Sequence, residues 1–350
     1  MRMKFGKSRG TVAVDLGSGQ VKMLVLENGG PTPRIASLGI ERLQPDAIVG
    51  GDIMDYRFVV DAVRTLRERL GVKPSSAATA VSGRDVIVKR IKMDRMRDAE
   101  ARKVIRWEAE QHVPFDMDSV SIDFEVLDPE GDGLQMDVLL VAAKMDLVET
   151  RMRLLKEAGF DTTVIDVDSF AVQTAFEQAY EHAAYGSFCL VNIGREVTNL
   201  SLIEQSSPVL TRDLSIGTRR FAEALVKELG ISLDEAESRL RSDEEMDTAS
   251  RDALKEPIES LVAPVERARS ILLSSEASQG RLDEVVLAGG GARLPGLSAA
   301  IERRLGTKIT VLDPLRAISA SPEVERSLAE HGGSSVLAVA VGLALRGKER

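Results

Sequence analysis

The residues of this chain that could do chemistry are concentrated in three glycine-containing segments, and the first runs from Asp15 to Lys22 with the sequence DLGSGQVK. We interpret it as a strand end, a tight turn and a second strand. A turn of small residues lets backbone N–H groups approach phosphate oxygens closely. Asp15 can orient waters around a Mg²⁺ that bridges phosphates, because Mg²⁺ keeps several waters and few carboxylates. An ordinary glycine-rich hairpin is the alternative. The residues assigned to phosphate binding are Gly17, Ser18, Gly19, Gln20 and Lys22, with Asp15 as the metal residue.

The second segment, NIGREVTN from Asn192 to Asn199, has the same pattern of strand, glycine turn and strand. It can surround terminal phosphates from the opposite side, with the backbone at Gly194 and the hydroxyl of Thr198 as donors. Asn192 stands where a carboxylate would best serve a metal-bound or attacking water. Because an amide brings no negative charge, we expect weak Mg²⁺ binding and weak activation of water at this position.

The third segment is a predicted buried strand that ends in Gly289, Gly290 and Gly291 before a helix. Bare backbone at this point allows a planar base and its ribose to lie against the chain. The glycines are contiguous, so the segment does not match the GxGxxG dinucleotide pattern. A plain loop between strand and helix is the alternative. We also assign Gly217, Glu237 and Arg293 to the nucleotide site.

The elements that must position these segments repeat along the chain. The strand, turn and strand of Thr11–Leu26 align with Phe188–Ile203, almost half the chain later. This repeat predicts a duplicated α/β fold whose halves face each other across a cleft, with a chance match of two buried strands as the alternative. Other helices are expected over Phe58–Leu70, Asp146–Ala158, Ser169–Glu181, Phe221–Leu229, Ser232–Leu240, Ala253–Ser275, Gly296–Leu305 and Ser335–Arg346, and other strands over Thr162–Val167, Asp283–Ala288 and Lys308–Leu312, with a polar loop over Ser242–Asp252.

The predicted organisation has two lobes and an insertion. Residues 1–10 form a flexible tail, 11–76 with 145–186 form the first lobe, 77–144 form an inserted α+β subdomain, and 187–350 form the second lobe with a helical subdomain at about 218–265. In the insertion we expect strands over Ala78–Ser82, Val86–Ile91, Ser121–Leu127 and Met136–Ala143 around a helix over Ala99–His112.

The single tryptophan, Trp107, lies on the predicted helix of the insertion. If Ile105 and Ala109 share its apolar side, it belongs to the core of the insertion. Direct contact with a partner is the alternative.

Composition limits the function classes. The chain has 350 residues, 43% hydrophobic and 29% charged residues and a formal net charge of −9, which makes nucleic acid a poor partner. Cys189 is the only cysteine, so an internal disulfide is excluded and a reducing compartment is expected. The longest apolar run is about half of the roughly 20 residues that a bilayer needs, and the first residues lack the apolar stretch of a secretory signal. We therefore expect a cytoplasmic protein.

The order and spacing of the three glycine segments resemble the actin, Hsp70 and sugar-kinase superfamily, whose two lobes are ribonuclease H-like. The resemblance implies that the first two segments contact the phosphates of a nucleotide and that the third contacts its adenosine. It also implies that an acid or amide at the start of the helix connecting the lobes holds the catalytic water, which makes Asp168 the candidate beside Asn192. A helix N-cap is the alternative role for Asp168, and one residue can do both.

The resemblance narrows further in the segment RWEAEQHVPF, from Arg106 to Phe115, which is similar to a hallmark of the PilM family of actin-like type IV pilus assembly proteins. The similarity extends over the chain from about Thr11 to Arg346. Further segments that carry it are Ser207–Ala236, Leu287–Leu297, Asp313–Leu315 and Ala340–Arg346.

The PilM resemblance implies that the insertion is placed as in the division protein FtsA. It further implies that ATP binds in the interlobe cleft and that the chain captures the cytoplasmic N-terminal peptide of PilN, a single-span inner-membrane protein. The peptide would lie between the first lobe and residues 77–144, held through main-chain hydrogen bonds and apolar pockets.

The function expected from these observations is an ATP- and Mg²⁺-binding scaffold of the type IV pilus platform, recruited to the cytoplasmic face of the inner membrane by its PilN-like partner. Hydrolysis should be slow or absent, so the protein is at most a weak ATPase, and nucleotide would act by biasing lobe closure. The alternatives are the equivalent platform component of a type II secretion system, a small-molecule kinase of the same superfamily, and an FtsA-like filament or membrane tether.

Overall fold

The first lobe is built on a five-stranded sheet with the strand order β10-β6-β1-β2-β3. The computed structural model of the chain describes residues 11–27, 32–73, 75–242, 245–274 and 281–347, so the expected tail at 1–10 lies outside the described residues. Strand β1 is buried along its whole length because helices cover both faces of the sheet. Its Val12 and Val14 side chains pack toward α1 and α3, and Ala13 faces the interior between the lobes. The elements are β1 (Val12–Leu16), β2 (Gln20–Glu27), β3 (Arg34–Arg42), α1 (Tyr56–Arg69), β6 (Ser75–Val81), α3 (Met145–Glu157) and β10 (Phe160–Val167), with a small β4 (Ile48–Val49) and β5 (Asp52–Ile53) pair.

The second lobe repeats the first. Its sheet has the order β13-β12-β11-β14-β15, in which an antiparallel meander precedes two parallel strands just as in the first sheet. The shared topology confirms the predicted duplication. These strands are β11 (Ser187–Ile193), β12 (Thr198–Glu204), β13 (Ser207–Leu214), β14 (Glu284–Ala288) and β15 (Lys308–Val311).

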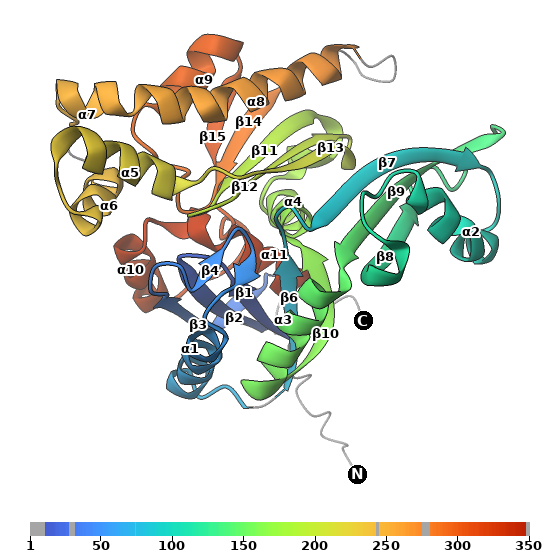
Figure 1. Cartoon of the computed structure of the whole chain (residues 1–350), viewed down its shortest axis with the longest axis horizontal. Helices are drawn as coiled ribbons and strands as arrows, with labels where there is room; N and C mark the ends of the chain where they lie inside the picture. The colour runs from blue at the N-terminus through green and yellow to red at the C-terminus, as the bar shows by residue number, and fades with distance from the viewer. Residues whose placement is uncertain (1–10, 28–31, 74, 243–244, 275–280, 348–350) are drawn as a thin grey trace.

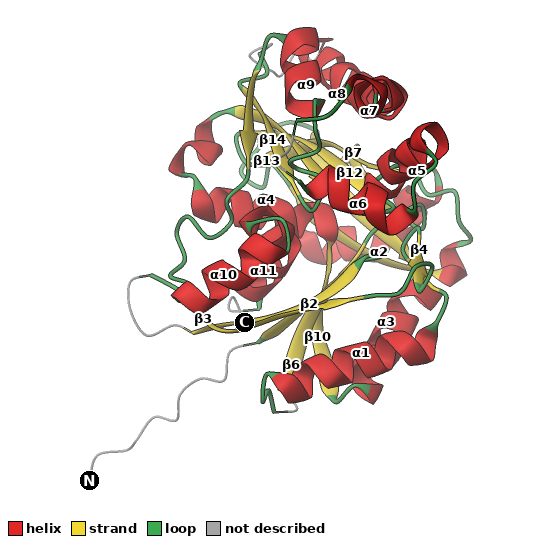
Figure 2. Cartoon of the chain, turned by 90° about the vertical axis from the view of Figure 1, so that its left-hand side faces the viewer, coloured by secondary structure: helices red, strands yellow, loops and turns green. Residues whose placement is uncertain are grey.

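The two sheets are joined through a helical layer formed by α4 (Asp168–Ala179) and α11 (Ala338–Arg346), which lie between them in Figure 2. One continuous hydrophobic core contains residues of both sheets and of both helices. The helices cross closely at Gly342, where a Cβ atom would lie 1.8 Å from the carbonyl oxygen of Ala171. A side chain larger than hydrogen at this position would separate the helices, so the packing between the lobes depends on a glycine.

A subdomain projects from the first lobe at the right of Figure 1 and consists of a three-stranded sheet, β7-β9-β8, with α2. The strand expected over Ala78–Ser82 forms as β6, but it pairs with β1 and β10 and so belongs to the first lobe rather than to the insertion. The sequence prediction was wrong here because a short apolar strand does not reveal its partner. The elements of the projecting subdomain are β7 (Val86–Asp94), α2 (Asp98–Glu110), the 3₁₀ turn η1 (Met117–Ser119), β8 (Val120–Val126) and β9 (Gln135–Lys144).

The position expected for Trp107 was also wrong. Its side chain is 73% exposed, whereas Ile105 and Ala109 are buried in the core of the insertion. Residues two apart in a helix point to nearly opposite sides, so Trp107 faces away from the stripe that Ile105 and Ala109 share.

Four helices form the outer part of the second lobe. Helix α5 ends at the left-handed Gly230, and the Ser232 hydroxyl caps α6 by accepting the Glu235 N–H, as the sequence predicts. The expected polar loop at 242–252 contains the short helix α7, capped by Asp247. These helices are α5 (Thr218–Leu229), α6 (Leu233–Arg241), α7 (Thr248–Ala253) and α8 (Lys255–Ser274).

The remaining elements lie between α4 and β11 or toward the C-terminal end. The sequence interpretation omitted β3, β13 and α10, although α10 begins with the N-cap serine Ser321 and a proline in its first turn, which are ordinary helix-start signals. These elements are α9 (Leu297–Leu305), α10 (Pro322–Glu330) and two 3₁₀ segments, η2 (Glu181–Tyr185) and η3 (Ser334–Leu337).

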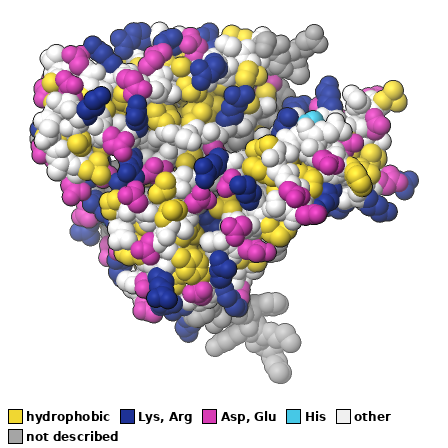
Figure 3. All heavy atoms as spheres, viewed as in Figure 1, with side chains coloured by type: hydrophobic (Ala, Val, Ile, Leu, Met, Phe, Trp, Pro, Cys, Tyr) yellow, Lys and Arg dark blue, Asp and Glu magenta, His cyan; other side chains and the backbone are white. Residues whose placement is uncertain are grey.

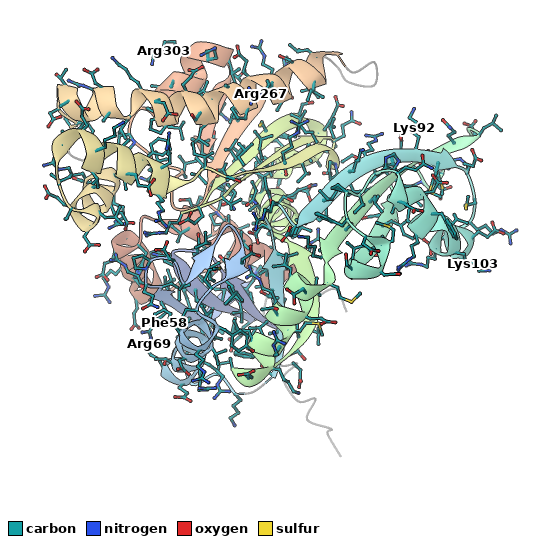
Figure 4. The ribbon with its side chains drawn as sticks, in the orientation of Figure 1. Phe58, Arg69, Lys92, Lys103, Arg267 and Arg303 are labelled. Atoms are coloured by element: carbon teal, nitrogen blue, oxygen red, sulfur yellow. The ribbon has the colours of Figure 1, made fainter. Side chains whose placement is uncertain are left out.

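The drawn surface carries mixed charges, with Lys and Arg interspersed among Asp and Glu in Figure 3. The labelled side chains of Figure 4 lie on outer elements, away from the space between the lobes: Phe58 and Arg69 on α1, Lys92 and Lys103 on the insertion, Arg267 on α8 and Arg303 on α9.

Within the described ranges, no single helix is both long and apolar enough to cross a membrane. The pair Pro322–Glu330 and Ser334–Arg346, bent by 97°, meets the criterion by length and composition only.

Candidate functional site

A cavity of about 310 Å³ lies between the lobes and brings the three glycine segments together. Both hairpin turns and the start of the triple-glycine segment form its walls, together with α6 and the segment around His331. The predicted site residues that line it are Asp15, Gly17, Ser18, Gly19, Gln20, Lys22, Asp168, Asn192, Gly194, Glu237, Gly289 and Gly290.

The two hairpin turns have the same backbone geometry. Each is closed by one hydrogen bond, from Gly17 N to Gln20 O at 3.2 Å in the first lobe and from Gly194 N to Val197 O at 2.9 Å in the second. A Cβ atom at Gly194 would lie 2.8 Å from that Val197 oxygen, so the turn itself requires a glycine there. The remaining N–H groups of these short turns are the donors available to an anion in the cavity.

The side chains behind the turns differ between the lobes. Asp15 pairs with Lys22, which lies opposite it in the ladder, at 2.9 Å. The equivalent pair in the second lobe is Asn192 and Asn199, joined by an amide hydrogen bond of 2.8 Å. Asn199 in turn donates to Asp213 at 2.7 Å.

Asp213 extends the second-lobe network to the first lobe. Its other carboxylate oxygen accepts the Gly83 N–H at 2.5 Å, in the turn between β6 and β7. Burial raises the pKa of Asp213, while the hydrogen bonds from Asn199 and Gly83 lower it. The buried amides therefore connect the cavity wall with the base of the projecting subdomain.

The triple-glycine segment serves the fold as well as the cavity. Gly289 has a φ of +79°, and a Cβ atom there would lie 2.5 Å from the Ile193 oxygen. Gly291 donates its N–H to the same oxygen at 3.0 Å and packs on the Ile193 side chain. Only Gly290 has open space where a Cβ would stand. Two of the three glycines thus fit β14 against the second hairpin, and one leaves room in the cavity.

Four predicted site residues do not line the cavity. Thr198 is fully buried and its hydroxyl donates to the Ile216 carbonyl at 2.7 Å, because strand alternation turns it away from the turn. Gly217 packs on the backbone of Arg195 beneath the hairpin, and Arg293 lies beside Gly333. With Gly291, these residues support the walls, and the hydroxyl donor expected at Thr198 is not available to a ligand.

Asp168 lies at the base of the cavity, in the first turn of α4. Val167 is the N-cap and makes no side-chain cap bond, so the alternative role of Asp168 as the cap is wrong. Burial, and then the nearby Asp15 charge, raise the pKa of Asp168 to about 7; a hydrogen bond with Ser82 and the charge of Arg151 oppose this shift. An acid with this pKa can hold or exchange a proton near neutral pH.

Arg151 is a buried cation that the sequence interpretation missed. Its guanidinium donates to the Leu16 carbonyl at 3.1 Å and the Gly51 carbonyl at 3.2 Å, and Nε has no partner among the described residues. Burial lowers its pKa, and the charges of Asp168 and Asp15 raise it. A signal was present in the sequence: Arg151 shares a helix face with Leu147, Leu154 and Leu155, where an unpaired charge is costly.

Arg195 was quoted in the second segment but given no role, and it reaches across the cavity. Its stem lies against Gly19 of the opposite hairpin, with Cδ 3.2 Å from the position of a Cβ there. Its Nη1 donates to Glu237 Oε1 at 2.6 Å. The second turn therefore contributes a charged side chain as well as backbone groups.

A family model described as type IV pilus assembly protein PilM matches residues 13–348. The chain belongs to the PilM family. A solved structure, described as the PilM–PilN type IV pilus biogenesis complex, contains a similar chain with a TM-score of 0.85 and 25% identity; the match covers 99% of this chain and 100% of that one.

Two other structures are similar in fold. The ethanolamine utilization protein EutJ from Carboxydothermus hydrogenoformans gives a TM-score of 0.58 at 18% identity, covering 97% of this chain and 90% of that one. MreB5 of Spiroplasma citri bound to AMPPNP gives 0.54 at 13% identity, covering 97% and 96%. The expected actin-like fold is confirmed, and the PilM family match favours the pilus interpretation over the secretion alternative.

Proposed function

We propose that this PilM-family protein is an ATP-binding scaffold of the type IV pilus assembly platform and that nucleotide occupies the interlobe cavity. The observation that carries the proposal is the convergence of two equivalent glycine turns and Gly290 on one cavity. Backbone donors from two sides suit a chain of phosphates, and the open space at Gly290 suits a flat base or ribose. The bound AMPPNP of the MreB5 structure shows that a protein of this fold takes such a ligand.

The residues present fit a magnesium ion held mainly through water and phosphate. Among the described residues, no group of three or more His, Cys, Asp or Glu side chains could hold a metal ion alone. Mg²⁺ commonly uses one or two carboxylates with substrate phosphates and waters, and Asp15 and Asp168 are the carboxylates at the base of the cavity. When bound, the ion would neutralise phosphate charge; Asp15 and Asp168 would orient its waters.

Slow hydrolysis follows from the second hairpin. Asn192 uses its amide to hold Asn199, so this wall offers no carboxylate to polarise a water. Asp168 is the acid we assign to the attacking water, and with a pKa of about 7 it is only partly ionised at neutral pH. Asp15, the other carboxylate at the base of the cavity, is paired with Lys22. A nucleotide in this site would act by stabilising one arrangement of the lobes.

The partner we propose is the cytoplasmic N-terminal peptide of a PilN-like inner-membrane protein. It rests on family membership and on the solved complex of a similar chain with PilN. The peptide would lie between the first lobe and the projecting subdomain and would bring this protein to the cytoplasmic face of the membrane.

Calorimetry with ATP–Mg²⁺, with ADP–Mg²⁺ and with a synthetic N-terminal peptide of the PilN-like protein from the same source tests the proposal. We expect the wild-type chain to bind ATP and the peptide. Gly290→Val should abolish ATP binding while the protein stays folded, because its Cβ meets open space in the cavity. Gly133→Val, in an exposed turn of the insertion where a Cβ meets only one atom at 3.6 Å, is the matched control. Absence of nucleotide binding by the wild type would remove the ATP proposal, and absence of peptide binding in every nucleotide state would remove the scaffold proposal.

A further inference from the structure

Arg195 joins the two proposed phosphate turns across the cavity. It leaves the second turn, and its stem passes Gly19 in the first, where a Cβ would lie 3.2 Å from Cδ and 3.4 Å from the Arg195 Cβ. Any larger residue at position 19 would push this side chain away. The contact therefore places the Arg195 stem against the first turn, and its guanidinium group reaches Glu237 on α6 at the cavity wall.

The guanidinium group of Arg195 has only part of its hydrogen-bonding capacity in use. Nη1 donates to Glu237 Oε1 at 2.6 Å, and Nη2 is buried without a partner in the part of the chain that the structure describes. Glu237 also lies 3.5 Å from Arg241 through its other oxygen. The side chains of Arg195 and Glu237 are 15% and 21% exposed, so the pair is shielded from water at the cavity wall. A buried donor without an acceptor is costly, and an anion beside it would remove that cost.

We propose that Arg195 recognises the terminal phosphate of the nucleotide and gives the site its preference for a triphosphate over a diphosphate. The inference rests on the proposed function and deepens it. Glu237 holds the guanidinium group when no phosphate is present, and the unpartnered Nη2 accounts for the capacity to take a second acceptor. Arginine suits this role because its planar fork donates two parallel hydrogen bonds to phosphate oxygens.

The rest of the second turn explains why a side chain is required there. The Thr198 hydroxyl is committed to Ile216, and the Asn192 amide to Asn199, so neither can contact the terminal phosphate. Arg195 is the cationic side chain that this turn brings into the cavity. Because its stem lies on Gly19 of the first lobe, a phosphate that engages it also strengthens the contact between the lobes.

The test compares Kd values for ATP and ADP, each with Mg²⁺, in the wild type, Arg195→Met and Arg195→Lys. Methionine keeps an unbranched stem on Gly19 and removes the charge. We expect Arg195→Met to weaken ATP binding by about 10- to 100-fold and ADP binding by less than about 3-fold, with Arg195→Lys between the wild type and Arg195→Met. Arg220→Met removes the same charge at an exposed site on α5 and should leave both Kd values unchanged.

The possible outcomes separate this inference from the proposed function. Equal losses for ATP and ADP, or no loss for either, would overturn the role of Arg195 and leave nucleotide binding intact. If the wild type binds neither nucleotide, both proposals fail. Thermal unfolding of each variant without nucleotide shows whether it still folds. If Arg195→Met does not fold, Arg195→Lys tests the role of Arg195, because it keeps the charge and changes only the phosphate-binding geometry.

Discussion

The two hairpins at the cavity share a backbone and differ in charge. Register, turn length and closing hydrogen bond are the same, yet one lobe places an Asp15–Lys22 ion pair behind its turn and the other an Asn192–Asn199 amide pair. Both pairs line the cavity. The second continues through Asp213 to the Gly83 N–H and so connects the lobes. Duplication therefore preserved the geometry that can bind phosphate, while the side chains behind it acquired separate roles.

The comparison explains where negative charge is found in the site. Asp15 and Asp168 lie on the first lobe's side, whereas the second hairpin presents amides and Arg195, and the carboxylates that the second lobe brings to the cavity, Asp234 and Glu237, come from α6. The carboxylates suit a hydrated cation, and the cation at Arg195 suits a terminal phosphate. The following predictions test this division, beginning with the largest expected effect.

The proton at Asp168 should depend more on the Asp15 charge of the first hairpin than on the Asp213 charge behind the second. The folded chain keeps this proton up to about pH 7, whereas the unfolded chain loses it near pH 4, so the free energy of unfolding should fall as pH rises through this window. The upper bound is about 4 kcal/mol. Asp168→Asn should reduce this slope most, since burial also raises the pKa of Asp166 and Asp213 and keeps part of it, and Asp15→Asn should reduce it less because the Asp15 charge is a smaller cause of the shift than burial. Asn192→Ala carries no charge change and should leave the slope in place. Denaturant unfolding at several pH values without Mg²⁺ measures the slope of the unfolding free energy against pH. An unchanged slope in Asp168→Asn would contradict the assignment of the raised pKa to Asp168.

Placing a carboxylate in the second hairpin should be unfavourable. Asn192→Asp turns the donor to Asn199 into an acceptor and adds a charge near Asp213, so we expect a loss of about 3 kcal/mol in the free energy of unfolding. Combining it with Asn199→Lys recreates the first-lobe pair and should recover more than half of the loss. Urea unfolding of the wild type, both single variants and the double variant gives a double-mutant cycle for the two positions. Additive losses would show that the two positions are not equivalent to Asp15 and Lys22.

Removing the first-lobe cation should leave Asp15 unpaired. The side chains of Lys22 and Asp15 are 12% and 8% exposed, so Lys22→Met should cost about 2 kcal/mol of unfolding free energy. The exposed pair Arg34–Glu27 supplies the control, because Arg34→Met should cost less than about 0.5 kcal/mol. Equal losses of unfolding free energy for Lys22→Met and Arg34→Met, measured by thermal or urea unfolding, would mean that burial does not strengthen the Asp15–Lys22 pair.

Side chains at the tips of the turns should matter least for stability. Ser18→Ala and Glu196→Ala should each change the free energy of unfolding by less than about 0.5 kcal/mol. Backbone hydrogen bonds close both turns, and Arg219 retains its ion pairs with Asp46 and Glu223 when Glu196 is removed. A loss above about 1.5 kcal/mol in either variant would show that the tips hold the turns closed.

Much of the fold was predictable because its signals are local. Gly71 and Gly230 follow their helices with positive φ values of 63° and 68°, and Ser232 caps α6. The convergence of three glycine segments was also predicted and is observed. The pairing of β6 and the exposure of Trp107 were predicted wrongly, since strand partners and the buried face of a helix depend on neighbours distant in sequence.

The sequence by itself determined the two glycine turns, the repeated strand pattern and the family, because backbone conformation and apolar alternation are properties of adjacent residues. Only the tertiary structure decided that Arg195 meets Gly19 and Glu237, that Arg151 is buried under the first turn, and that Asp213 reaches Gly83. Each of these contacts joins segments far apart in the chain. Two of them, Arg195 with Gly19 and Asp213 with Gly83, also join the lobes, which the core containing α4 and α11 holds against each other.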